Sequence, residues 1–256
     1  MTRLVDLSMP VHRDMLTFPR VPPPTLVLYE SWEEFAERIG AAAEGATWLT
    51  ASYLVIQNDH VGTHCDAVKH LRGPDAPGVE GIPIEYCFSD GVVLDFRDRA
   101  SGYRITPDDI EGSLEQIGYE LKERDIVLIH TGAGAYNTEE RYRTDHCGMT
   151  AEATRHLIAQ GVRMMGIDAI TFDPPVWAMF EGKHFWEAHR VMIDDDYWHL
   201  ENLMNLEQIG RPFGFQLCVL PIKWVDTTAA PVRAIAIVED EMADSTTPRP
   251  SAEPTI

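Results

Sequence analysis

The 256-residue chain is 45% hydrophobic and 9% aromatic, a composition typical of a folded protein and unlike that of a disordered one. Its net charge of −20 argues against binding to nucleic acid or to anionic membrane surfaces, because both would repel it. The four cysteines form no CxxC pair, which indicates free thiols in a reducing compartment, and no stretch approaches 18 consecutive apolar residues. We therefore expect a cytoplasmic protein with no membrane segment.

The first quarter of the chain predicts three strands and one helix. The strands are expected over the β-prone segments 3–8, 25–29 and 47–57. Ser31 is suited to cap a helix over residues 32–43, with acidic residues in its first turn. Four apolar residues recur at helical spacing along this helix and predict a stripe that faces the core: Trp32, Phe35, Ile39 and Ala43.

The rest of the chain alternates between apolar strand patterns and helices. Strands are expected over 91–96, 125–130, 162–168, 215–220 and 232–238. Thr106 and Thr150 are suited to begin helices that end near Ile117 and Gln160. This alternation favours right-handed crossovers and parallel pairing in part of the sheet. We expect one α/β domain over residues 1–240, with a mixed, partly parallel sheet flanked by helices (swivelling β/α/β-like).

Two further segments are interpreted without assigning them a function. The glycine-containing stretch 131–134 follows a strand, but it lacks the third glycine and the following helix of a dinucleotide-binding loop, so we interpret it as a structural turn. Residues 241–256 lose hydrophobic periodicity, and we expect a flexible C-terminal tail there.

Three histidines and one aspartate lie within eleven residues: His60, His64, Asp66 and His70. In a strand, the first two histidines would lie roughly 13 Å apart, whereas the ligands of one metal ion must lie about 2.0–2.2 Å from it. The segment must therefore fold back between them, and Gly62 is the residue best able to allow this. One histidine would be interpreted as an ordinary hydrogen-bonding residue, but three with an aspartate favour a site for zinc, manganese or iron.

The pattern His60-x-Gly62-Thr63-His64-x-Asp66-x-x-x-His70 resembles the signature of the cyclase-type metal-dependent hydrolases, which include bacterial kynurenine formamidase and isatin hydrolase. The resemblance spans residues 4–238. It implies that the residues matching His60, His64 and Asp66 hold one metal ion.

The resemblance also implies a second metal ion, bridged by Asp66 and held by His189 and Glu201. Isatin hydrolases lack this glutamate, so the chain looks more like the two-metal formamidase branch. From the residues alone, His189 and Glu201 could equally be an ordinary histidine and glutamate near a helix. We expect two divalent ions per chain, zinc or manganese.

The matching residue for His70 in the family donates and accepts a proton and is not a ligand. Metal-activated water would attack a carbonyl group, and the leaving amine or alkoxide would need the proton that a histidine can supply. The expected function is hydrolysis of a small cyclic or acyl amide, or of a lactone. Two alternatives stay open: a non-catalytic metal-binding protein, and a metal-dependent lyase or isomerase. His70 favours an enzyme, because a structural metal site needs no free base beside it.

Two features concern the substrate and the assembly. The formamidase pattern commonly has a Trp/Tyr-Pro-Gly-Asp turn where this chain has Phe18-Pro19-Arg20-Val21, so the kynurenine substrate is not carried over. Val68 also replaces a proline usual in the family, a change that the backbone should tolerate. Family members are commonly dimers or tetramers, and we expect a homo-oligomer.

An aromatic loop over residues 172–186 precedes His189, and four of its rings are Trp177, Phe180, Phe185 and Trp186. These rings pack either in the core or at an interface, or they line the substrate pocket. If they line the pocket, the small-molecule substrate should carry a flat apolar ring.

Overall fold

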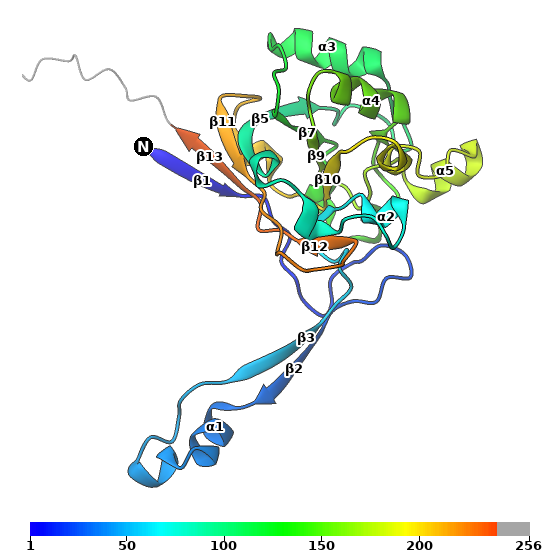
Figure 1. The fold of residues 1–256 in the computed structure, drawn as a ribbon. Coiled ribbons are helices and arrows are strands. Elements are labelled where there is room, and N and C mark those ends of the chain that lie inside the picture. Colours follow the sequence, from blue (N-terminus) through cyan, green and yellow to red (C-terminus); the bar gives the residue numbers. More distant parts are fainter. Residues whose placement is uncertain (240–256) are drawn as a thin grey trace, which may run out of the picture.

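A nine-stranded mixed sheet forms the body of the protein in the computed structural model, which describes residues 1–239 (Figure 1). The expected tail over 241–256 lies outside the described residues. In sheet order the strands are β1 (Thr2–Asp6), β13 (Ile235–Glu239), β11 (Phe215–Cys218), β5 (Phe88–Asp95), β7 (Ile126–His130), β9 (Met164–Ile167), β10 (Trp198–Glu201), β4 (His64–Asp66) and β12 (Ala229–Pro231).

The four central strands β5, β7, β9 and β10 are parallel, and the outer strands pair antiparallel. Helix α3 (Pro107–Ile117) connects β5 to β7, and helix α4 (Ala151–Ala159) connects β7 to β9. Both helices begin at the expected threonines, whose hydroxyl groups accept backbone N–H bonds from the first turn. Short strands β6 (Arg104–Ile105) and β8 (Gly148–Met149) pair beside them. The predicted α/β class with a mixed, partly parallel sheet is confirmed.

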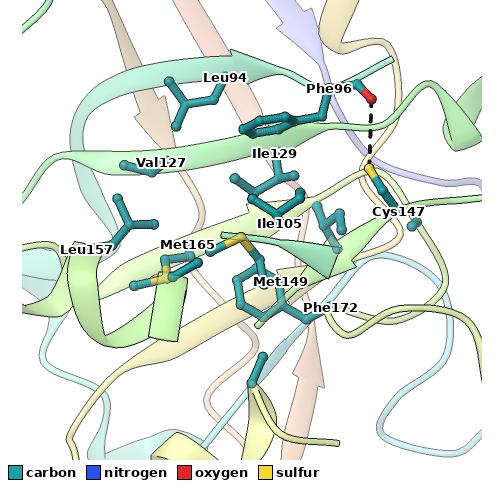
Figure 2. Packing of buried hydrophobic residues seen from close by; sticks show 14 of the residues in the cluster. Leu94, Phe96, Ile105, Val127, Ile129, Cys147, Met149, Leu157, Met165 and Phe172 are labelled. Atoms are coloured by element: carbon teal, nitrogen blue, oxygen red, sulfur yellow. Dashed lines mark hydrogen bonds between the residues drawn. The ribbon is translucent and has the colours of Figure 1, made fainter. Parts of the chain in front are cut away.

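Strands β7 and β9 are buried on both faces and are apolar apart from His130. In β7, Val127 and Ile129 join the cluster below α3 and α4 that Figure 2 shows, whereas Ile126 and Leu128 join a second cluster on the opposite face. Alternation along one strand thus supplies two cores.

The segment from β2 (Thr25–Glu30) to β3 (Ser52–Ile56) forms an antiparallel hairpin that extends away from the body and carries α1 (Trp32–Arg38) near its tip (Figure 1). We call residues 25–56 the arm. Ser31 caps α1 as expected, but the helix ends at Arg38 because Gly40 takes a left-handed conformation.

The predicted core-facing stripe on this helix is wrong. Trp32 stacks on Trp48 within the arm, with ring centroids 4.8 Å apart, and Ile39 is 51% exposed. The helix has an apolar face, but within residues 1–239 neither hydrophobic cluster of the body includes a residue of this helix.

Several short elements were absent from the sequence prediction: β4, β10, β12, α2 (Lys69–Arg72) and α5 (Val176–Gly182). The expected structural turn at 131–134 is present, and buried Asp168 holds it by accepting the N–H groups of Thr131 and Gly132. Within residues 1–239, no helix has both the length and the apolar character needed to cross a membrane.

Candidate metal centre

Strands β4 and β10 form the floor of the site. They run antiparallel, with His199 opposite Asp66 and Glu201 opposite His64. Because side chains alternate along a strand, these four residues share one face of the sheet. Cys65 between them points to the opposite face and packs in a hydrophobic cluster, as its position in the sequence suggests.

The chain folds back before β4 at Gly62, as the spacing requires. Gly62 has a φ of 69°, and a Cβ atom there would lie 2.8 Å from the side chain of Val11. The hydroxyl group of Thr63 fixes the turn by donating to the Asn202 carbonyl at 2.5 Å and accepting the Met9 N–H at 2.7 Å. This turn lets the side chain of His60 reach the floor.

The carboxylate of Asp66 lies at the centre, between two pairs of histidines. Its Oδ1 lies 3.5 Å from Nε2 of His60 and 3.2 Å from Nε2 of His64. Its Oδ2 lies 3.6 Å from Nε2 of His189 and 3.4 Å from Nε2 of His199. One carboxylate thus faces two separate groups of donors, as a bridging ligand does.

Glu201 closes the deeper side of the site. Its Oε1 lies 3.3 Å from Nε2 of His189 and 3.5 Å from Nε2 of His199, and its Oε2 lies 3.5 Å from Nε2 of His64. The backbone N–H of Phe172 donates to Oε1 at 2.7 Å and fixes the carboxylate.

Several buried side-chain nitrogen and oxygen atoms at this site have no hydrogen-bond partner within residues 1–239. They are Nε2 of His60, Nε2 of His64, both carboxylate oxygens of Asp66 and both ring nitrogens of His199. Each such atom costs about 1–3 kcal/mol when it is left unpaired. Their convergence on one small space therefore fits a bound cation. Two groups of residues could each hold a metal ion, because within each group one ligand atom per residue lies within 4.8 Å of the others. The first group is Asp66, His189, His199 and Glu201, and the second is His60, Asp66 and His70.

In three of the histidines, a hydrogen bond at Nδ1 orients the ring so that Nε2 faces the site. Nδ1–H of His64 donates to the Gly62 carbonyl at 2.9 Å, which turns Nε2 toward the site. His60 bonds through Nδ1 to Asp59 at 2.9 Å, and His189 bonds through Nδ1 to Asp173 at 2.5 Å. Such carboxylate–histidine pairs are typical of metal sites. Sequence reasoning missed both aspartates, although Asp59 stands next to His60.

Burial and neighbouring charges set the protonation of the site. Burial lowers the pKa of His64, but Asp66 and Glu201 outweigh it and raise the pKa to about 9. For His70, burial prevails over the attraction of Asp66 and lowers the pKa to about 4. Burial would raise the pKa of Glu201, but the adjacent imidazole groups of His189 and His199 lower it below its usual range.

A pocket of about 740 Å³ opens above the floor, and His60, Asp66 and His70 line its base. Six apolar residues form part of its wall: Phe18, Val21, Leu71, Ile170, Phe185 and Trp186. Asp59, Thr171, His189 and Glu201 also line it. Asn58, Arg190 and Thr228 add polar groups at its edge. This combination of an apolar wall and a few converging polar groups is typical of small-molecule sites.

The aromatic loop is divided between two environments. Phe185 and Trp186 line the pocket, whereas Trp177 donates its indole N–H to the Thr144 carbonyl at 3.0 Å outside the pocket. Phe172 lies beneath the site and stacks on His199.

Residues 18–21 form a tight turn. The N–H of Val21 donates to the Phe18 carbonyl at 2.9 Å, and Arg20 takes the positive φ that glycine favours. Phe18 and Val21 therefore both face the pocket. Because valine replaces aspartate, this turn offers no carboxylate to a substrate.

All six residues expected at the site lie together in the structure: His60, His64, Asp66, His70, His189 and Glu201. His199 was missed as a candidate ligand. The available signal was its spacing, because a residue two positions before Glu201 on a strand must share its face.

Comparison with known proteins identifies the family of the chain. The model of the Cyclase family matches residues 5–174, and the chain belongs to this family. An uncharacterised protein, MJ0783, from Methanocaldococcus jannaschii is 28% identical over 188 residues, which cover 72% of this chain and 81% of the relative.

Three solved structures share the fold. Isatin hydrolase A from Labrenzia aggregata, bound to benzyl benzoate, superposes with a TM-score of 0.76 at 23% identity, covering 93% of this chain and 94% of that one. An isatin hydrolase bound to the product analogue thioisatinate gives 0.79 at 19% identity, covering 93% of each chain. A predicted metal-dependent hydrolase from Bacillus stearothermophilus gives 0.68 at 20% identity, covering 93% of this chain and all of the other.

Proposed function

We propose that this protein is a divalent-metal-dependent hydrolase of a small cyclic or acyl amide, or of a lactone. The observation that carries the proposal is a group of buried imidazole and carboxylate atoms at the base of the pocket that have no hydrogen-bond partner within residues 1–239. The isatin hydrolases with the same fold support a small cyclic substrate.

The donor set fits two ions, zinc or manganese. His60, His64 and Asp66 would hold the first, and Asp66 would bridge to a second held by His189 and Glu201. A divalent ion in such a site polarises a carbonyl oxygen and lowers the pKa of a water molecule from 15.7 to about 7.

His70 would transfer the proton that this reaction requires. Its Nε2 lies 4.0 Å from the nearer oxygen of Asp66, whereas the Nε2 atoms of the other four histidines lie 3.2–3.6 Å from this carboxylate. The side chain of His70 is 35% exposed and lines the pocket. Burial lowers its pKa to about 4, so the ring is neutral near pH 7 and can accept a proton from water. It would return that proton to the leaving amine or alkoxide as the C–N or C–O bond breaks.

The apolar wall would orient the substrate and exclude bulk water. Phe18, Phe185 and Trp186 offer flat surfaces on which an unsaturated ring can stack. No strongly basic cluster lines the pocket within residues 1–239; Arg190 is its one lysine or arginine. The geometry therefore favours a substrate held by ring burial rather than by charge.

A direct test measures activity and metal content together. Protein purified without chelator should contain zinc or manganese by elemental analysis and should hydrolyse members of a panel of aryl amides, lactones and isatin. Exhaustive chelation should abolish activity, and Zn²⁺ or Mn²⁺ should restore it, with mock-dialysed protein as the control. Full activity in metal-free protein would contradict the proposal.

We also infer a homo-oligomer, a dimer or tetramer, located in the cytoplasm. The arm supports the first inference because apolar residues are exposed along both of its strands, including Leu28 and Val55. The four free cysteines support the second. Light scattering of purified protein and cell fractionation test these two inferences separately.

A further inference from the structure

We propose that the two metal positions are unequal, because His199 completes a closed set of four protein ligands around the deeper position. Asp66, His189 and Glu201 would supply the other three ligands, while the position at His60 and His64 stays open toward the pocket. The inference rests on the proposed function and assigns a distinct task to each ion.

The distances at the deeper position match four-coordinate geometry. Ligands that lie about 2.0–2.2 Å from a tetrahedral ion are separated from one another by about 3.3–3.6 Å. Nε2 of His199 lies 3.4 Å from Oδ2 of Asp66 and 3.5 Å from Oε1 of Glu201. Nε2 of His189 lies 3.6 Å and 3.3 Å from the same two oxygens. The four separations that join the two imidazole groups to the two carboxylates therefore fall within the tetrahedral range.

The surroundings of His199 leave its ring without any other partner. The residue is fully buried, and neither ring nitrogen has a hydrogen-bond partner within residues 1–239. Phe172 stacks on the ring at 4.5 Å with an 8° angle between the planes, which fixes the ring plane but offers no acceptor. A neutral histidine of the core would direct at least one nitrogen to a polar partner. Coordination of an ion is the arrangement that satisfies Nε2 here.

The other position is formed by His60, His64 and Asp66, and Oε2 of Glu201 lies 3.5 Å from Nε2 of His64 on its deeper side. Oδ1 of Asp66 lies 3.5 Å from Nε2 of His60 and 3.2 Å from Nε2 of His64, and the side chain of His60 is 19% exposed. At the deeper position His189 and Glu201 also line the pocket, but their side chains are only 5% and 7% exposed, and His199 is fully buried. Structural zinc sites are closed by four protein ligands, whereas catalytic sites keep one coordination place free for water or substrate. The deeper ion would therefore hold Asp66 in place, and the open position would meet the substrate.

The experiment isolates the deeper position and reads its coordination directly. His60→Ala removes a ligand from the open position only, so Co²⁺ bound to this variant reports the deeper position. We expect one ion per chain with the intense visible absorption of four-coordinate Co²⁺. Adding His199→Ala should weaken binding by more than about 100-fold, beyond the 10–100-fold typical of residues that only orient a ligand, and should remove the intense bands. His146→Gln in the His60→Ala background is a matched control, because His146 is also a buried histidine with an unpartnered Nε2 but lies outside both ligand groups.

The outcomes separate the inference from the proposed function. A second route needs no substitution of His199: X-ray absorption of Zn²⁺-loaded His60→Ala should show two imidazole ligands per ion. One imidazole, or a Co²⁺ spectrum and affinity unchanged by His199→Ala, would overturn the closed position and leave the hydrolase intact. Wild-type protein that binds no metal would overturn both. Circular dichroism of the metal-free variants establishes that each is folded.

Discussion

The metal-binding floor and the arm are two pairs of antiparallel strands with opposite arrangements of polarity. In the floor, β4 and β10 bury charged and polar side chains at the centre of the body, and Asp66 and His199 are fully buried. In the arm, β2 and β3 expose apolar side chains to solvent on both faces. Each arrangement is unfavourable for an isolated chain, since buried polar atoms need partners and exposed apolar strands tend to associate. By our inferences, bound metal completes the floor and another chain completes the arm.

The comparison is tested most strongly at Asp66, which faces both pairs of histidines. Asp66→Ala should remove the shared ligand of both positions, so metal content should fall from about two ions to less than one per chain. Because metal-ion catalysis contributes several kcal/mol, kcat/KM should fall by more than about 10³-fold. Elemental analysis and steady-state kinetics measure the two effects. The exposed Asp98 provides a control, and Asp98→Ala should leave both values unchanged; full metal content in Asp66→Ala would exclude the bridging role.

His70 tests whether every histidine at the floor is a ligand. His70→Ala should retain its metal but lose about 10²–10⁴-fold in kcat, the usual contribution of a general acid or base. Loss of an ion together with activity would instead make His70 a ligand, as its proximity to His60 and Asp66 also allows.

The pocket wall should have a smaller effect, confined to ring-containing substrates. Full burial of a large apolar side chain is worth about 1.5–3 kcal/mol, so Trp186→Ala should lower kcat/KM for an aryl substrate by about 10–100-fold and spare a matched alkyl substrate. Trp177→Ala is the control from the same loop, because Trp177 does not line the pocket. Equal losses for both substrate classes would show that Trp186 supports the fold and not ring recognition.

Acidification should weaken metal binding. Histidine binds a metal only when it is neutral, and the raised pKa of His64, about 9, means that a proton must be displaced at neutral pH. Affinity for Zn²⁺ should therefore fall as pH decreases below 9, by about tenfold per pH unit for each displaced proton. Titration calorimetry in buffers of different ionisation enthalpy measures the protons released. Binding that is independent of pH between 7 and 8 would contradict this protonation state.

Local spacing in the sequence was enough to find much of the floor. His60, His64 and Asp66 lie close together in the chain, and the need to converge also predicted the fold-back at Gly62. The role of His199 depends on strand pairing, because only the register of β10 with β4 brings it opposite Asp66. Short strands such as these carry too few residues for a periodic pattern to reveal the pairing.

The arm shows a different limit of sequence reasoning. The periodicity that predicted a core-facing helix identified a real apolar face, on which Trp32 meets Trp48. Periodicity states which side chains face together, but not whether the body of the same chain covers them. A helix at the end of a long hairpin has the same pattern as a helix in a core.

The smallest effect on catalysis is expected in the arm. An isolated two-stranded hairpin is marginally stable in water, and Leu54, Val55 and Ile56 are each about half exposed or more, at 49%, 55% and 63%. If a second copy covers these residues, Val55→Lys should place a charge in the interface and lower the mass in solution to that of the monomer. Because the arm lies away from both hydrophobic clusters of the body, thermal stability should change by only a few tenths of a kcal/mol, as for other surface substitutions. Light scattering over a range of concentrations measures the mass, and Thr50→Lys, at an exposed polar position of the same arm, controls for added charge. A wild-type protein that is monomeric at every concentration would contradict the inference that a second copy covers the arm.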